Sequence, residues 1–129
     1  MSENHGKIWW TELNTHKVDK AKDYYAHVLG WRFDETPMEG GIVYNVAMLG
    51  DTPVAGIFDI SSMPEMAQVP DHWFTYVAVD DVDAAAASTE KLGGKIQRAP
   101  WDVAGVGRVA IVQDAAGAHL GLMTPTPEG

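Results

Sequence analysis

The chain has 129 residues, of which 46% are hydrophobic and 21% charged, and this composition is typical of one compact globular domain. Its 18 acidic and 9 basic residues give a net charge of −9, which disfavours nucleic acid and anionic membrane surfaces as partners and leaves neutral or cationic small molecules acceptable. The absence of cysteine excludes disulfides, thiolate metal ligands and a cysteine nucleophile.

The first half of the chain predicts a strand, a helix and three further strands. Residues 8–14 mix aromatic, apolar and polar side chains as a strand does. A helix is indicated next by apolar residues spaced three or four apart, namely Val18, Ala21, Tyr25, Val28 and Leu29. Gly30 ends it, since glycine tolerates the left-handed conformation of a helix C-cap. Strands are expected at residues 31–34, 42–49 and 54–60, with a turn at residues 50–53.

The second half predicts the same order of elements. Residues 61–71 contain two prolines, two methionines and no clear period, so we interpret them as a linker. A strand at residues 73–79 and a helix at residues 82–92 follow, and Gly93 and Gly94 end this helix. Three more strands are expected at residues 95–98, 108–113 and 119–124. We therefore expect a single domain, with one module at about residues 7–60 and a second at about residues 72–124.

An internal repeat supports this division. An offset of 64 residues pairs Thr11 with Thr75, Val18 with Val82, Asp19 with Asp83, Ala21 with Ala85 and Gly30 with Gly94. Further along, an offset of 65 pairs residues 55–58 with residues 120–123, so one residue inserted in a loop accounts for the change. A single βαβββ module cannot bury a sheet face alone. We expect an α+β fold in which two such modules form a curved eight-stranded mixed sheet around a cleft, with the helices outside.

The motifs resemble those of the vicinal-oxygen-chelate superfamily, the glyoxalase/bleomycin-resistance/dioxygenase type. In the first half they are WTELNT at 10–15, AKDYY at 21–25 and LGW at 29–31, and in the second half FTYVAVDDVD at 74–83, KLGG at 91–94 and DAAGAHLGLM at 114–123. The resemblance covers nearly the whole chain and is greatest to a glyoxalase-like subgroup described as hydroxylase-like. It implies homodimers, but the function has to be argued from the site.

The resemblance also implies four metal-ligand positions. In metal-binding relatives the first and last strands of each module each donate one ligand, typically His, Gln or Glu, because divalent metals take nitrogen or oxygen donors. The matching positions here are Trp10, Gly56, Phe74 and Gly121. None of these side chains can ligate a divalent ion, so we expect no metal at the usual site and no other cofactor.

Strand alternation then selects the residues expected to line the cleft. If Trp10 points inward, Glu12 and Asn14 do so too; Phe74 brings Tyr76, and Gly121 brings His119 and Met123. Candidate catalytic groups are Glu12, His119 and Tyr76, because a carboxylate among rings can have a raised pKa, an imidazole titrates near neutrality and a phenol can donate a hydrogen bond. Candidate ligand contacts are Trp10, Asn14, Gly56, Phe74, Gly121 and Met123.

Three functions remain open from the sequence. The first is a metal-free domain whose aromatic cleft binds a small organic molecule, either to sequester it or to convert it by acid/base chemistry. The second is a metal-dependent lyase, isomerase or dioxygenase with a displaced divalent metal held by Glu12, His119 and His72. The third is a non-catalytic dimeric interaction module. Since no secretion signal or membrane span is apparent, we expect the cytoplasm.

Overall fold

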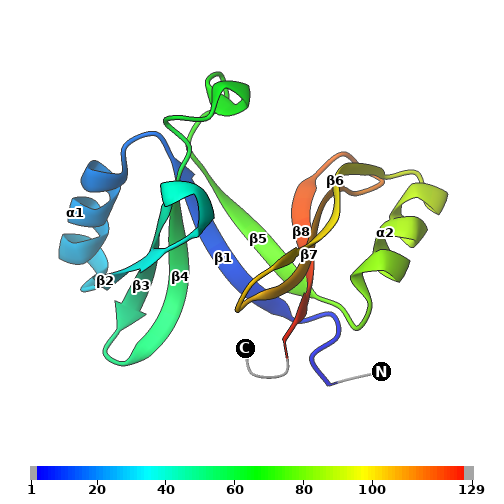
Figure 1. Ribbon diagram of the computed structural model, residues 1–129, viewed down its shortest axis with the longest axis horizontal. Coiled ribbons are helices and arrows are strands. Elements are labelled where there is room, and N and C mark those ends of the chain that lie inside the picture. Colours follow the sequence, from blue (N-terminus) through cyan, green and yellow to red (C-terminus); the bar gives the residue numbers. More distant parts are fainter. Residues whose placement is uncertain (1–2, 127–129) are drawn as a thin grey trace. The chain divides into compact units, whose positions relative to one another are not determined.

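The computed structural model describes residues 3–126, which contain two α-helices and eight strands (Figure 1). The first module comprises β1 (Ile8–Thr15), α1 (Val18–Leu29), β2 (Arg32–Pro37), β3 (Val43–Leu49) and β4 (Thr52–Asp59). The second comprises β5 (His72–Ala78), α2 (Val82–Lys91), β6 (Lys95–Val103), β7 (Gly107–Gln113) and β8 (His119–Pro125). Two short 3-10 turns, Glu39–Gly41 and Pro64–Met66, occur in the connections. Neither helix within residues 3–126 has the length and apolar character needed to cross a bilayer.

The strands form one mixed sheet in the order β2-β3-β4-β1-β5-β8-β7-β6. Within each module the first strand pairs with the last in parallel, and the other pairs are antiparallel. The predicted α+β fold with an eight-stranded mixed sheet is therefore confirmed. The cleft stays a prediction.

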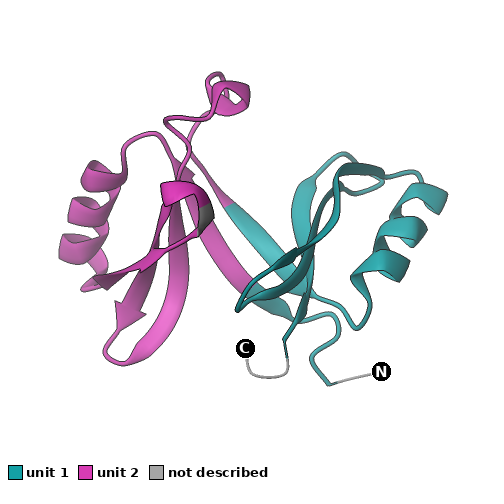
Figure 2. Cartoon of the chain, in the orientation of Figure 1, with its two compact units in different colours: residues 1–9, 74–129 teal, residues 10–73 magenta. Residues whose placement is uncertain are grey.

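Two compact units make up the chain (Figure 2). Unit 2 comprises Trp10–Trp73, and unit 1 comprises the described residues before and after it. The boundary falls inside β1 because the N-terminal segment pairs with the end of β5: the Gly6 N–H donates to the Ala78 carbonyl at 2.7 Å, and the Ala78 N–H donates to the Lys7 carbonyl at 2.9 Å. The predicted linker, residues 61–71, belongs to unit 2.

The strand register shows the internal repeat directly. Glu12 on β1 is aligned with Gly56 on β4, and Tyr76 on β5 is aligned with Gly121 on β8. These are the residues that the offsets of 64 and 65 make equivalent. On the neighbouring strands, Val46 opposes Gly56 and Ile111 opposes Gly121. Val46 on β3 is therefore equivalent to Ile111 on β7, and the offset between them is 65.

The additional residue therefore precedes β7 and is accommodated within a strand, whereas the sequence suggested a loop. The pairing of β6 with β7 shifts register between Ile96 and Arg98 and again between Arg98 and Trp101. β6 also runs five residues past the predicted end at Arg98, through Pro100. Proline is tolerated there because β6 is an edge strand with bulged pairing, so the missing N–H costs no regular ladder bond.

The helices end at glycine, as predicted. Gly30 has φ 72° and its N–H donates to the Ala26 carbonyl, which closes α1. At α2 the C-cap is Leu92, and Gly93, with φ 97°, follows it and donates its N–H to the Glu90 carbonyl at 3.2 Å. The two N-termini differ, because Asp81 accepts a hydrogen bond from the Ala84 N–H at 3.2 Å, whereas Lys17 at the start of α1 provides no side-chain cap.

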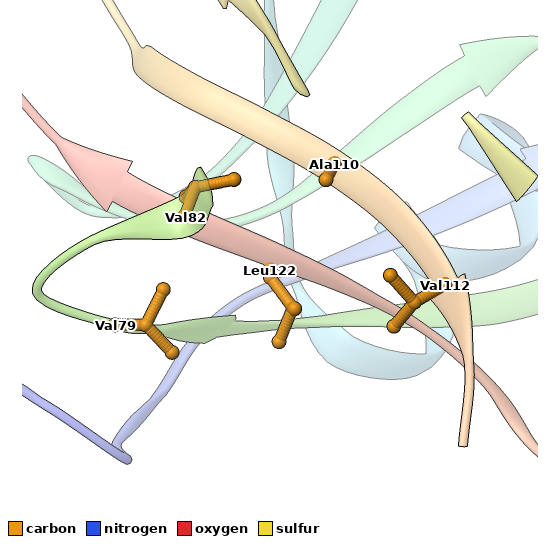
Figure 3. Packing of buried hydrophobic residues seen from close by; sticks show 5 residues of the cluster. All are labelled: Val79, Val82, Ala110, Val112 and Leu122. Carbon is orange, nitrogen blue, oxygen red and sulfur yellow. The ribbon is translucent and has the colours of Figure 1, made fainter. Parts of the chain in front are cut away.

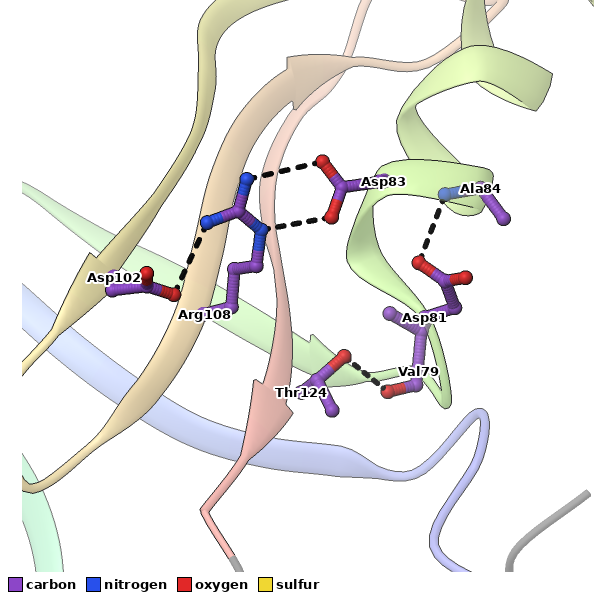
Figure 4. Close-up of polar contacts among 7 residues, drawn as sticks. All are labelled: Val79, Asp81, Asp83, Ala84, Asp102, Arg108 and Thr124. Carbon is purple, nitrogen blue, oxygen red and sulfur yellow. Dashed lines mark hydrogen bonds and ion pairs between the residues drawn. The ribbon is translucent and has the colours of Figure 1, made fainter.

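The core of unit 1 lies between α2 and its sheet (Figure 3). Its buried members are Val79, Val82, Ala110, Val112 and Leu122. In the same unit, the guanidinium of Arg108 on β7 joins α2 to β6. It donates to Asp83 on α2 at 2.8 and 3.2 Å and to Asp102 on β6 at 3.1 Å (Figure 4). These bonds hold the pKa of the Asp83 carboxyl below its usual range.

Unit 2 is packed differently. Leu13, Ala47, Ala55 and Ile57 are buried on its sheet, but no residue of α1 is fully buried. The helix is instead held through aromatic rings. Tyr25 stacks on Trp31 with ring centroids 5.4 Å apart and meets Trp73 edge to face at 5.6 Å.

Candidate functional site

One face of the unit 2 sheet carries the residues that the sequence singled out in the first module. On β1, alternation directs the side chains of Trp10, Glu12 and Asn14 to one face of the sheet and that of Leu13 to the other. Glu12 is aligned with Gly56 on β4. Residues aligned across neighbouring strands share a face, so Trp10 and Gly56 lie on the side opposite Leu13. α1 covers the Leu13 side, where Ala21 and Tyr25 adjoin that leucine.

A hydrogen bond joins two aromatic side chains on this face. The Trp10 indole N–H donates to the Tyr44 hydroxyl oxygen at 2.9 Å. The Tyr44 ring in turn lies over the backbone of Gly56, so closely that a Cβ at Gly56 would collide with its hydroxyl. The Phe58 ring is 6.4 Å from that of Tyr44. The side chains on this face therefore form a layer of aromatic rings over the backbone of Gly56.

Sequence reasoning missed Tyr44, although the pattern contains a signal for it. Tyr44 and Val46 alternate on β3, and Val46 opposes Gly56. A large aromatic residue diagonal to a strand glycine is the usual way of filling the space that the absent side chain leaves. The sequence predicted Gly56 as a ligand contact, and the structure shows a side chain of the same unit against it.

Unit 1 repeats the arrangement with different partners. Tyr76 is aligned with Gly121, and a Cβ at Gly121 would collide with the Tyr76 ring. Phe74 meets Tyr76 edge to face, with centroids 5.2 Å apart. The buried cluster that contains Leu122 occupies the opposite face. Gly121 thus makes room for a ring, just as Gly56 does.

The remaining candidates differ in exposure and contacts. Met123 is 4% exposed and Asn14 is 7% exposed, so both are largely enclosed. His119 is exposed at the start of β8, and its Nδ1 lies 2.7 Å from the Gln97 amide oxygen. Because an amide oxygen only accepts, the Nδ1 N–H is the donor in this contact.

The segment before β5 is anchored by a carboxylate. The Thr15 hydroxyl and the His16 N–H donate to Asp71 at 2.5 and 3.0 Å. The Thr15 bond first, and then the His16 bond, lower the pKa of the Asp71 carboxyl. His16 Nε2 also lies 2.7 Å from the Val69 carbonyl oxygen. The end of the predicted linker is thereby fixed to the end of β1.

Comparison with known proteins identifies the family. Residues 7–122 match the model of the Glyoxalase/Bleomycin resistance protein/Dioxygenase superfamily. The chain belongs to this superfamily. The resemblance stated from the sequence motifs is therefore confirmed.

Two relatives are more than 30% identical to this glyoxalase-superfamily chain over the aligned residues. "Putative glyoxylase CFP32" of Mycobacterium tuberculosis is 37% identical over 123 residues, which are 95% of the chain and 46% of the relative. The anthracycline biosynthesis protein DnrV of Streptomyces peucetius is 34% identical over 118 residues, which are 92% of the chain and 41% of the relative. The chain thus spans less than half the length of these relatives.

Solved structures agree on the fold. The methylmalonyl-CoA epimerase of Mycobacterium tuberculosis superposes with a TM-score of 0.66 at 17% identity, covering 99% of this chain and 94% of that one. The protein BH1468 of Bacillus halodurans superposes with a TM-score of 0.73 at 10% identity, covering 96% and 97%. At such identities the likeness extends to the fold of this superfamily member and not to its chemistry.

The side chains at the family's four metal-ligand positions do not fit a divalent ion. Trp10 and Phe74 have no basic donor atom, and Gly56 and Gly121 have no side chain. At both glycines a tyrosine ring fills the space where a ligating side chain would project. Within residues 3–126, no three His, Asp or Glu side chains come together in an arrangement able to hold a metal ion.

Proposed function

We propose that this superfamily member binds a small, mainly apolar organic molecule against the ring-bearing faces of its sheet, without the divalent metal of its metal-dependent relatives. One observation carries the proposal: Trp10 is hydrogen-bonded to a tyrosine whose ring occupies the ligand position at Gly56. The strands that would hold a metal in such relatives here present aromatic surface. The proposal extends to a homodimer, as the family resemblance implies, and to the cytoplasmic location expected from the sequence.

The chemistry of the faces favours a planar ligand. Rings of Trp10, Tyr44 and Phe58 in unit 2 and of Phe74 and Tyr76 in unit 1 offer flat apolar surface with polar edges. Such surfaces stack on aromatic or conjugated molecules. The name of the Streptomyces peucetius relative refers to anthracyclines, which are fused-ring compounds, and this agrees with a ligand of that shape.

The charge of the protein further restricts the class of ligand. Glu12 lies on the same face as Trp10, and the chain carries a net charge of −9. A neutral or cationic molecule is therefore favoured over an anion at this face.

Conversion of the ligand would use the groups already named. His119 Nδ1 is held by Gln97, Glu12 lies on the same face as Trp10, and the Tyr76 ring meets that of Phe74. Each of these side chains can transfer a proton at a carbon or oxygen of a molecule bound to its own unit. Sequestration needs only the rings, so binding is the part of the proposal to test first.

Binding can be tested with naphthol as a neutral planar probe. We expect saturable binding that Trp10→Leu weakens about tenfold, because a stacked ring contributes on the order of 1 kcal/mol or more. The matched control is Trp9→Leu, the neighbouring residue on the opposite face of β1, which leaves the affinity unchanged. Equal losses in both variants, or no binding by the parent protein, would overturn the proposed site. Stoichiometric metal in the same purified sample would overturn its metal-free part.

A further inference from the structure

A groove on the other side of the unit 2 sheet has no part in the proposed function. It has a volume of about 410 Å³ and opens between the start of α1, the end of β1 and the segment before β5. Leu13 and Thr15 line it, and strand alternation places both side chains on the face opposite Trp10 and Glu12. The volume is within the range of small-molecule sites, roughly 300–1,000 Å³.

The walls of the groove are fixed by contacts within unit 2. Asp71 is held by the Thr15 hydroxyl and the His16 N–H, which anchors one wall to β1. Two residues later, the Trp73 indole N–H donates to the Tyr25 hydroxyl at 3.2 Å, which ties that wall to α1. A groove whose sides are joined in this way needs little reorganisation to accept a ligand.

Exposed rings provide its apolar surface. Tyr24 is 58% exposed and Trp73 is 41% exposed, and both line the groove beside Ala21. Large aromatic side chains left open to water beside a concavity are a common feature of sites that bind another ring. The groove is therefore suited to a planar aromatic group of one or two rings.

Two lysines give the groove a charge opposite to that of the chain. Lys17 and Lys20 line it, and neither ammonium forms an ion pair within the described residues. The one carboxylate of the lining, Asp71, already accepts bonds from Thr15 and His16 on its two oxygens. Besides these bonds, the charge of Lys17 helps to lower the pKa of Asp71, and with two ammonium groups and one carboxylate the lining has an excess of positive charge on a chain of net charge −9.

We propose that this groove is a second binding site, for a small aromatic carboxylate. Its ring lies against Tyr24 and Trp73, and its carboxylate is bound by Lys17 and Lys20. The ligand class differs in charge from the one proposed for the opposite face. The two sites can therefore be tested separately.

Naphthoate is the probe, and amide NMR spectra report where it binds. We expect saturable shifts confined to residues 13–25 and 71–73, with millimolar or tighter affinity. The double variant Lys17→Gln/Lys20→Gln should weaken binding about fivefold, because exposed ion pairs contribute modestly. Lys91→Gln, at the end of α2, is the matched control and leaves the affinity unchanged. Uncharged naphthamide should bind the parent protein as weakly as naphthoate binds the double variant.

Three results would overturn this site: shifts located elsewhere, no saturation in the millimolar range, or equal affinity of naphthoate and naphthamide. Trp10→Leu distinguishes it from the ring-bearing face. This substitution should leave naphthoate binding intact while it weakens naphthol binding. Loss of both probes in Trp10→Leu would show that they share one site and would overturn the second site alone.

Discussion

Tyr44 packs against Gly56 so closely that the hydroxyl of the tyrosine occupies the position where a Cβ of the glycine would lie. Gly56→Ala should therefore displace the ring and break its hydrogen bond with Trp10. We expect a loss of about 1–3 kcal/mol in the free energy of unfolding, the usual cost of overpacking. Urea denaturation followed by tryptophan fluorescence measures it.

A double-mutant cycle supplies the control for this substitution. In a Tyr44→Leu background the collision is relieved, so Gly56→Ala should cost less than half of what it costs in the parent chain. Additive losses would show that the tyrosine is not the group that excludes a side chain at Gly56.

Much of the arrangement around Gly56 could be predicted from the sequence. The family resemblance placed Trp10 and Gly56 at one site, and alternation along β1 added Glu12 to the side of Trp10, because side-chain direction in a strand has a strict period of two. The left-handed glycine at Gly30 likewise has a local cause. Such features depend on neighbours in the chain.

Tyr44 and Asp71 could not be predicted in the same way. The contact of Tyr44 depends on the register of β3 against β4 and on its rotamer. Asp71 is 56 residues from Thr15 in sequence, and nothing local indicates that their side chains meet. The extension of β6 through Pro100 was missed because proline reads as a strand breaker unless the strand is known to be a bulged edge.

Asp71→Asn tests the anchor of the groove wall. The folded pKa of this carboxyl is lowered, first by the Thr15 hydroxyl and then by the His16 N–H. Its contribution is therefore fully present above the unfolded pKa, about 3.9, and is lost as the pH falls through the folded value. At neutral pH we expect a loss of about 1 kcal/mol, reduced by solvent screening, and the difference from the parent should vanish in strong acid.

Urea denaturation at a series of pH values makes this measurement. Asp51→Asn, in the exposed turn between β3 and β4, is the control and should show no comparable dependence. A difference between Asp71→Asn and the parent that grows as the pH falls would contradict the direction of the pKa shift.

Chelation tests the metal-free site. With rings and glycine at the four ligand positions, dialysis against a chelator should leave the Tm unchanged, and later addition of zinc or nickel should not raise it. A metal bound only by the native state would add about 2.7 kcal/mol at a hundredfold excess over its Kd, which is several degrees in a domain of this size. A Tm that falls on chelation and recovers with one equivalent of metal would favour the displaced site of Glu12, His119 and His72.

The attachment of α1 gives the last test. Because the helix has no fully buried residue, the ring contacts of Tyr25 with Trp31 and Trp73 should contribute much of the free energy that holds it to the sheet. Tyr25→Phe keeps the ring and loses only the hydrogen bond from Trp73, so it should cost about 1 kcal/mol or less. Tyr25→Ala should cost about 3 kcal/mol. Tyr24→Ala, the more exposed neighbour, should cost clearly less than Tyr25→Ala; equal losses in urea denaturation would show that the helix is held by other contacts.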